Sequence, residues 1–252
     1  MSQRRSGLSP ACWLDADLPT VAENLALDEA LLAEVHEGLR GGPVLRTWMA
    51  AEPTVVLGSS SHLSEEIDPD ACQAAGVRVL RRPSGGLTVV LGPGCLMWSV
   101  IAPLPETAPG IESIHAAMLD PLCAALTVAG RPVLRRGASD IAIDVDGMER
   151  KVSGNALRIR RGAVLYHGTL LDRFDIGLIS RVLRHPPREP GYRAQRPHEA
   201  FLANLRLGRE PLEAAVRRAF AADDVRRDWP QDRVTTLVRD RYLDAAWTHR
   251  LP

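Results

Sequence analysis

Residues 151–156, Lys-Val-Ser-Gly-Asn-Ala, combine a potentially reactive side chain with small neighbours. Lys151 is the only lysine among the 31 Lys and Arg residues of the chain. Its ammonium group is a compact point charge with an adjustable pKa, whereas a guanidinium group is a larger planar fork. Small residues beside it leave room for a ligand against the chain. The segment indicates an amine held against a ligand, and the alternative interpretation is a solvated lysine on a surface strand.

The string Arg-Arg-Pro-Ser-Gly-Gly, which begins at Arg81, forms a second candidate binding segment directly after a predicted strand. Arg81 and Arg82 could clamp a phosphate or a carboxylate between two guanidinium groups. Beside Ser84, the residues Gly85 and Gly86 allow the backbone to approach a ligand closely, and exposed amides could bind an anion. The alternative interpretation is a solvated loop, because charged side chains are mostly exposed.

A histidine and three carboxylates complete the candidate groups. His167, in the run Tyr-His-Gly-Thr-Leu-Leu, could act as an acid or base, although such a histidine is more often packed or hydrogen-bonded. Asp140 opens a predicted strand, and its simplest interpretation is a solvated carboxylate at a strand edge. Asp28 and Glu29 lie on the first predicted helix, where we expect a solvated face. His115 and His198 lack partners at metal-binding spacing, and no Gly-x-Ser-x-Gly elbow of a serine hydrolase occurs.

Periodicity and turn residues predict an α+β fold that positions these groups. Thr20 and Glu23 form a capping box before a helix that ends near residues 41–42, and Asp146-Gly147 predicts a β-hairpin. Pro121 is expected to kink or divide a helix over residues 111–129, whose inward positions begin at Ile111. Strands are predicted at residues 44–48, 54–57, 77–80, 88–91, 96–101, 141–145, 150–153 and 163–171, and helices at residues 68–75, 175–184, 197–206, 210–222 and 231–247.

Composition narrows the function classes. The 252 residues, 45% hydrophobic, suffice for a sizeable core, and no linker divides them, which favours one domain. The 31 acidic and 31 basic residues balance, so neither nucleic-acid nor membrane binding is indicated. Four widely spaced cysteines and an N-terminus without a signal-peptide pattern fit a reduced, cytoplasmic protein. Residues 83–105 are uncharged, but their glycines and prolines predict buried strand and loop rather than a membrane span.

In their order along the chain, these segments resemble the lipoate–protein ligase A family, within the wider biotin/lipoate ligase catalytic fold. The resemblance covers nearly the whole chain, from Asn-Leu-Ala-Leu-Asp-Glu-Ala-Leu-Leu at residues 24–32 to His-Gly-Thr-Leu-Leu at residues 167–171. It implies a class II synthetase-like fold, with a mixed or antiparallel central sheet and flanking helices. It further implies a single catalytic domain over residues 1–252, without the small C-terminal accessory domain that bipartite ligases need for activation.

The resemblance also implies an activity. Such ligases use ATP and Mg²⁺ to convert lipoate, or octanoate, to an acyl-adenylate. They then transfer the acyl group to a lysine of a lipoyl carrier domain, of the 2-oxoacid dehydrogenase E2 or glycine cleavage H protein type. On this basis Lys151 would stabilise the charge that develops as the acyl group leaves. Arg81 or Arg82 would lie near the carboxylate and phosphate.

The remaining implied roles concern the nucleotide, the metal and the acyl chain. Asp140 would lie near Mg²⁺ or the phosphate. The loop that covers the acyl-adenylate would include Ser84, Gly85 and Gly86; the nucleotide side would be lined by Ser153, Gly154 and Asn155; and the acyl pocket would be bordered by His167 and Gly168.

Departures from the family pattern keep alternatives open. Leu87 stands where a third glycine is expected, and Leu91-Gly92 where a His-Asp pair is expected. One alternative is an ATP-independent octanoyl or lipoyl transferase with a Cys nucleophile, for which Cys95 is an outside candidate because no cysteine follows Cys123. Another is a catalytically silent carrier-binding subunit, partnered by a separately encoded accessory protein. A biotin ligase fits less well, because Arg-Arg-Pro-Ser-Gly-Gly replaces its Gly-Arg-Gly-Arg-x-Gly loop.

Overall fold

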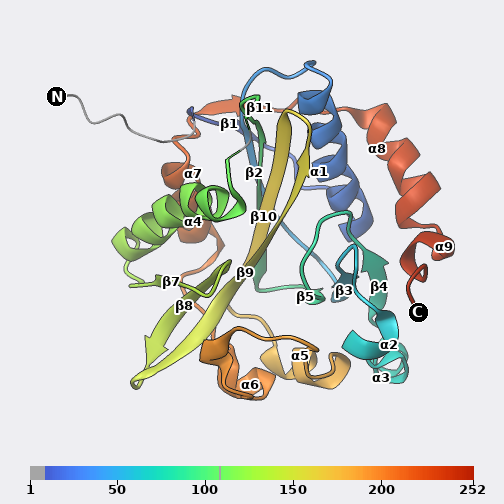
Figure 1. Cartoon of the computed structure of the whole chain (residues 1–252), viewed down its shortest axis with the longest axis vertical. Coiled ribbons are helices and arrows are strands. Elements are labelled where there is room, and N and C mark those ends of the chain that lie inside the picture. The colour runs from blue at the N-terminus through green and yellow to red at the C-terminus, as the bar shows by residue number, and fades with distance from the viewer. Residues whose placement is uncertain (1–8, 108) are drawn as a thin grey trace.

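An eight-stranded mixed sheet forms the centre of the computed structural model, which describes residues 9–107 and 109–252 (Figure 1). Its strand order is β11-β1-β2-β6-β10-β9-β8-β7. Strand β1 pairs in parallel with both of its neighbours, and the other pairs are antiparallel. The strands of this sheet are β1 (Cys12–Leu14), β2 (Val44–Met49), β6 (Cys95–Pro103), β7 (Leu134–Arg136), β8 (Asp140–Val145), β9 (Met148–Arg160), β10 (Ala163–Leu171) and β11 (Asp224–Arg226).

A second, three-stranded sheet and the helices flank the central sheet, so the predicted α+β class is confirmed (Figure 1). The second sheet has the order β4-β3-β5, from β3 (Thr54–Leu57), β4 (Arg78–Arg81) and β5 (Val89–Leu91). The helices are α1 (Val21–His36), α2 (Leu63–Glu66), α3 (Pro69–Ala74), α4 (Ile111–Val128), α5 (Ile176–Val182), α6 (His198–Phe201), α7 (Arg209–Ala219), α8 (Gln231–Leu237) and α9 (Ala245–Thr248), with a 3₁₀ turn at Gly191–Arg193 and a π-helical turn at Val238–Tyr242.

Strand β6 shows how the sheet separates two hydrophobic cores. Side chains alternate between the two faces of a strand. Cys95 and Met97 therefore pack into the core that contains α1 and the second sheet, while Leu96 and Trp98 pack into the core that contains α4 and α7. All four are buried, which explains why residues 83–105 carry no charge. The prediction of buried strand and loop there is confirmed.

Helix α1 begins at the predicted capping box: the Glu23 amide donates to the Thr20 hydroxyl, and the Thr20 amide donates to the Glu23 carboxylate. The helix is buried on nearly all sides, because it packs on the central sheet and against α8 (Figure 1). The expectation that Asp28 and Glu29 lie on a solvated face is wrong: their exposed fractions are 2% and 8%.

Helix α4 is the one helix within the described ranges that is long and apolar enough to cross a membrane by length and composition alone. A core helix passes the same test, and α4 packs against α7 and buries Ile114, Met118 and Leu122. Pro121 lies inside this helix without dividing it. Ile111, predicted to point inward, is 58% exposed because it occupies the first helical position.

The predictions are least accurate after residue 173. Residues 197–206 form only the short α6, and the single helix predicted over residues 231–247 is divided into α8, the π turn and α9.

Three short strands, β1, β7 and β11, are not predicted. They have three residues each, too few for periodicity to show.

Candidate active site

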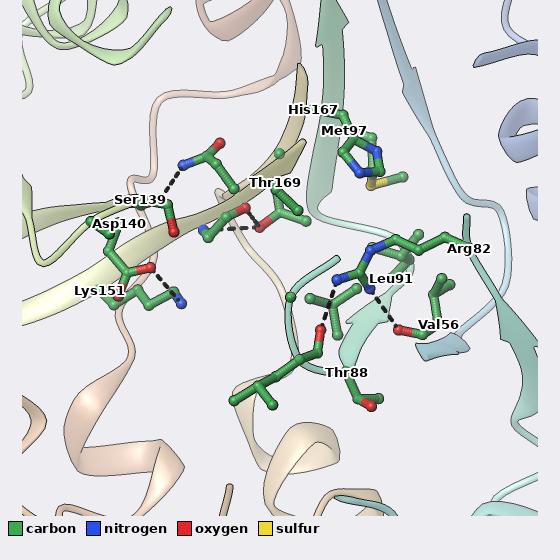
Figure 2. Close-up of a pocket in the computed structure, with 18 of the residues that line it drawn as sticks. Val56, Arg82, Thr88, Leu91, Met97, Ser139, Asp140, Lys151, His167 and Thr169 are labelled. Atoms are coloured by element: carbon green, nitrogen blue, oxygen red, sulfur yellow. Dashed lines mark hydrogen bonds and ion pairs between the residues drawn. The ribbon is translucent and has the colours of Figure 1, made fainter. Parts of the chain in front are cut away.

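A cavity of about 590 Å³ opens beside β9 and β10. Segments 86–89, 137–140 and 188–191 border it, and Figure 2 labels Thr88, Ser139 and Asp140 from the first two. Its apolar wall includes Leu25, Trp48 and Met97. Eight residues predicted from the sequence line it, namely Arg82, Gly86, Asp140, Lys151, Gly154, Asn155, His167 and Gly168.

Lys151 and Asp140 form an ion pair in the cavity wall (Figure 2). The Lys151 Nζ lies 2.8 Å from Asp140 Oδ1, and the Tyr192 hydroxyl donates to Asp140 Oδ2 at 2.9 Å. Burial, followed by the Asp140 carboxylate, raises the pKa of Tyr192, so this phenol remains a proton donor. Asp140 is 6% exposed, so it is a buried counter-ion of Lys151 rather than a solvated strand-edge carboxylate.

A β-bulge aims Lys151 into the cavity. Asp140 pairs with Gly154, and Ala142 pairs with Lys151, so the register shifts by one residue between them. In a regular strand, residues 151 and 154 would point to opposite faces. The bulge places both beside Asp140. A Cβ on Gly154 would lie only 2.8 Å from Lys151 Nζ, so the absence of a side chain there gives the ammonium group its position.

Arg82 lines the cavity but uses its donors on its own loop and on the neighbouring residues Val56 and Leu87. Its Nε donates to Ser84 Oγ at 3.1 Å and its Nη1 to the Val56 carbonyl at 3.0 Å. Its Nη2 donates to the carbonyls of Gly85 and Leu87. Burial lowers the pKa of Arg82 to about 10, which leaves it protonated at neutral pH. Arg82 therefore shapes residues 81–86, named here the arginine loop.

Arg81 points away from the cavity and is fully buried. Its guanidinium group donates to the backbone carbonyls of Gly58, Ser61, Thr248 and Leu251. The prediction that Arg81 contacts substrate does not fit this placement. Ser84 and Gly85 also lie outside the cavity wall, although Ser84 touches a wall residue.

A chain of polar contacts joins the arginine loop to α1 through His167. Ser84 Oγ lies 2.6 Å from His167 Nε2, and His167 Nδ1 lies 4.0 Å from Asp28 Oδ2. Asp28 Oδ1 accepts from Arg46 at 2.7 Å and from Ser99 at 2.9 Å. Burial, followed by the Arg82 charge, lowers the pKa of His167 to about 3. With so low a pKa, His167 accepts a proton poorly, which suits a packed, hydrogen-bonded role beside the cavity better than that of a general base.

Asn155 is held by Gly168 and the β7–β8 connection. Its Nδ2 donates to the Ser139 carbonyl at 2.7 Å. A Cβ on Gly168 would lie 1.6 Å from Asn155 Oδ1, so only glycine fits opposite it in β10. Ser153 borders a second cavity of about 150 Å³, which adjoins the first at Lys151 and Gly154.

Known proteins with this sequence pattern identify the family. The sequence model of the lipoyl protein ligase A/B catalytic domain matches residues 20–223. The chain belongs to this family. Octanoyltransferase LipM of Carboxydothermus hydrogenoformans is 31% identical over 218 residues, which are 80% of each chain. Lipoate-protein ligase A subunit 1 of Thermoplasma acidophilum is 25% identical over 232 residues, or 87% of each chain.

Solved structures confirm the predicted fold of the lipoyl ligase family. The bipartite lipoate protein ligase of Thermoplasma acidophilum, described with its E2 lipoyl domain, superimposes with a TM-score of 0.80 at 22% identity, over 97% of this chain and 98% of that chain. A lipoate-protein ligase A bound with ATP also gives 0.80, at 24% identity, over 96% of this chain and 100% of that chain. Its match to the family model and its 31% identity to LipM make the protein an enzyme of the family that comprises lipoate ligases and octanoyltransferases.

The positions of two residues in this lipoyl ligase family site are not predicted from the sequence. Asp28 lines the cavity, and the apolar residues all round its helix were the available signal that it is buried. Tyr192 lies in a segment without periodicity, and nothing in the sequence connects it to Asp140. The Mg²⁺ assignment to Asp140 stays a prediction, and among the described residues no cluster of three or more His, Cys, Asp or Glu side chains could hold a metal.

Proposed function

We propose that this protein is the catalytic domain of an ATP-dependent lipoate–protein ligase, which forms an acyl-adenylate from lipoate or octanoate and transfers the acyl group to a carrier lysine. The observation that carries the proposal is the placement of Lys151 in a cavity that no cysteine borders. An ammonium group has three donors. One faces Asp140, which leaves two for the oxygens of an anionic ligand.

The cysteines support a route without a thioester. Acyl transfer through cysteine requires a thiolate at the reacting carbonyl. Cys95 is fully buried outside the cavity wall, and burial raises its pKa to about 12. Burial also raises the pKa of Cys123 to about 11, in α4. Both shifts disfavour the nucleophilic form.

In the proposed mechanism, Lys151 binds the carboxylate of the acid and then the oxygens of the adenylate, where negative charge develops as the acyl group leaves. Asp140 and Tyr192 hold the ammonium group over Gly154 before substrate arrives. The acyl chain lies along the apolar wall that includes Trp48 and Met97. Arg82 keeps the arginine loop in shape beside it.

The residues present do not fit a resident Mg²⁺ site. Magnesium is usually bound through one or two carboxylates together with substrate phosphates. Asp140 is the carboxylate nearest Lys151, and its two oxygens already face an ammonium group and a phenol. We therefore treat magnesium as part of the Mg–ATP substrate and assign it no protein ligand.

The proposed partners are lipoyl carrier domains of the 2-oxoacid dehydrogenase E2 or glycine cleavage H protein type. A separately encoded accessory protein is a further proposed partner, since one similar chain is named subunit 1 of its ligase and a similar solved structure is that of a bipartite ligase. We propose a single catalytic domain acting in the cytoplasm, where its four cysteines stay reduced.

The test is pyrophosphate exchange with Mg–ATP and lipoate, with and without any accessory protein encoded beside the chain. We expect exchange that requires lipoate, and labelling of a lipoyl domain on its lysine in a mass spectrum. Loss of exchange in Lys151→Ala serves as the control. A wild-type protein without exchange under either condition overturns the ligase proposal.

An octanoyl transferase is the second candidate, because LipM of Carboxydothermus hydrogenoformans is 31% identical. Its test offers an octanoylated carrier domain as donor and an unmodified lipoyl domain as acceptor, without ATP. Transfer under those conditions, together with an acyl group trapped on a cysteine, decides for the transferase.

A further inference from the structure

Arg81 is a fully buried cation, and within the described part of the chain its guanidinium group donates to backbone carbonyls. Its Nη1 donates to the carbonyls of Gly58 and Ser61 at 2.8 and 2.7 Å. Its Nε donates to Thr248 at 2.9 Å and its Nη2 to Leu251 at 3.3 Å. The guanidinium group thus bridges two segments that are far apart in sequence. Burying a guanidinium group is costly unless its N–H donors have acceptors. The position of Arg81 therefore depends on the carbonyls of both segments.

Residues 245–251 also donate hydrogen bonds back to Arg81 and to the 58–61 segment. Trp247 Nε1 donates to the Arg81 carbonyl at 2.8 Å, and Arg250 donates to the Ser59 carbonyl. The indole ring lies under two guanidinium groups, 4.1 Å from Arg250 and 4.7 Å from Arg241. Helix α9 packs on β4, at the edge of the second sheet (Figure 1).

The same contacts continue to the cavity. The Ser59 amide donates to the Ser84 carbonyl at 2.8 Å, and Ser84 Oγ contacts His167 in the cavity wall. A Cβ on Gly58 would lie 1.9 Å from the carbonyl oxygen of Gly86, so residues 58–61 and the arginine loop touch backbone to backbone. A shift of residues 58–61 therefore moves the loop.

We propose that residues 245–251 are a positioning element of the active site, and that Trp247 and Arg81 fix the arginine loop for ligand binding without touching the ligand. The element lies outside residues 20–223, the part that matches the family. On this proposal Arg81 has a structural role in holding the backbone, and Arg82 is the arginine of the pair that borders the ligand. The kinetic part of this inference rests on the proposed function, and the structural part does not.

The test removes one hydrogen bond and retains the ring. Trp247→Phe keeps an aromatic side chain beside Arg241 and Arg250 and removes the donor to Arg81. We expect the Ser59 and Arg82 amides to exchange hydrogen about fivefold faster, the factor that one net hydrogen bond represents. The Michaelis constant for lipoate in pyrophosphate exchange should rise by a similar factor, with kcat within about twofold of the wild type.

Trp13→Phe is the matched control, because Trp13 lies in β1 of the central sheet, where its ring packs against Arg217 rather than against Arg241 and Arg250. Arg81→Lys is the second variant: it keeps the charge, loses the planar fork, and should show the same local increase in exchange.

Three outcomes overturn the proposal: unchanged exchange in the loop of Trp247→Phe, faster exchange across β9 and β10 as well, or faster loop exchange with unchanged kinetics. If the wild type shows no pyrophosphate exchange, the proposed function has failed. The lipoate dissociation constant from calorimetry then replaces the Michaelis constant, and an unchanged constant in Trp247→Phe overturns the positioning role.

Discussion

The arginine loop and residues 151–156 border the same cavity, and they differ in what their cations bind. Arg81 and Arg82 each donate four hydrogen bonds, seven of them to backbone carbonyls and one to Ser84. Lys151 contacts one carboxylate oxygen and keeps two donors for a ligand. A five-donor planar fork suits a framework that must satisfy several carbonyls at once, whereas a compact ammonium group suits an oxygen whose charge changes during a reaction.

The largest effect should come from Lys151, the cation that faces the ligand. We expect Lys151→Arg to lower pyrophosphate exchange more than about 100-fold, by analogy with the loss of one transition-state donor. The larger fork cannot occupy the space over Gly154 and still face Asp140. Its unfolding temperature should stay close to that of the wild type, because Lys151 is partly exposed. Activity near that of the wild type would contradict the claim that residue 151 requires an ammonium group rather than a guanidinium group.

The framework side should be visible in the pH dependence of stability. Folding lowers the pKa of His167 from 6.5 to about 3, so the unfolded chain binds one more proton between these values. Stability is therefore complete above about pH 6.5 and falls as the pH approaches 3, with a slope of at most ~1.4 kcal/mol per pH unit. His167→Gln removes this proton and should flatten the slope measured by urea unfolding from pH 6.5 to 4.5.

The exposed His62 provides the control for that measurement, because it lies on the surface at the start of α2. His62→Gln should leave the wild-type slope unchanged. An equal slope in the wild type and His167→Gln would mean that burial beside Arg82 does not hold His167 neutral.

How far the sequence predicts this arrangement differs between the two segments. It correctly predicts the longer strands, the Asp146-Gly147 hairpin and eight of the residues that line the cavity, because periodicity and turn chemistry are local. The bulge that brings Lys151 and Gly154 to one face depends on pairing with β8, which no local pattern shows. The displacement of Arg81 from the site depends on carbonyls about 170 residues away, at Thr248 and Leu251. Long-range contacts of this kind lie beyond residue patterns.

A smaller effect should follow from loosening the lysine itself. Tyr192→Phe removes the hydrogen bond to Asp140 and leaves the ion pair with Lys151 in place. Since one net hydrogen bond represents roughly a fivefold factor, we expect kcat to fall by about that much. Tyr166→Phe is a matched control, because that hydroxyl contacts His115 in the core rather than Asp140. Equal kcat values for the two variants would show that the Tyr192 hydroxyl does not contribute to the function of Lys151.

The smallest effect is expected at Cys95, and it tests whether the two segments suffice without a thiol. Cys95 packs in the core beside β10, where Cys95→Ala removes a buried sulfur and leaves the cavity wall unchanged. We expect pyrophosphate exchange within about twofold of the wild type, and a loss of unfolding free energy of about 1 kcal/mol for the missing contacts. A loss of activity comparable with that of Lys151→Arg, with an acyl group trapped on Cys95 in the wild type, would assign the reaction to a thioester. The free ammonium donors of Lys151 would then serve acyl transfer between carriers rather than adenylation.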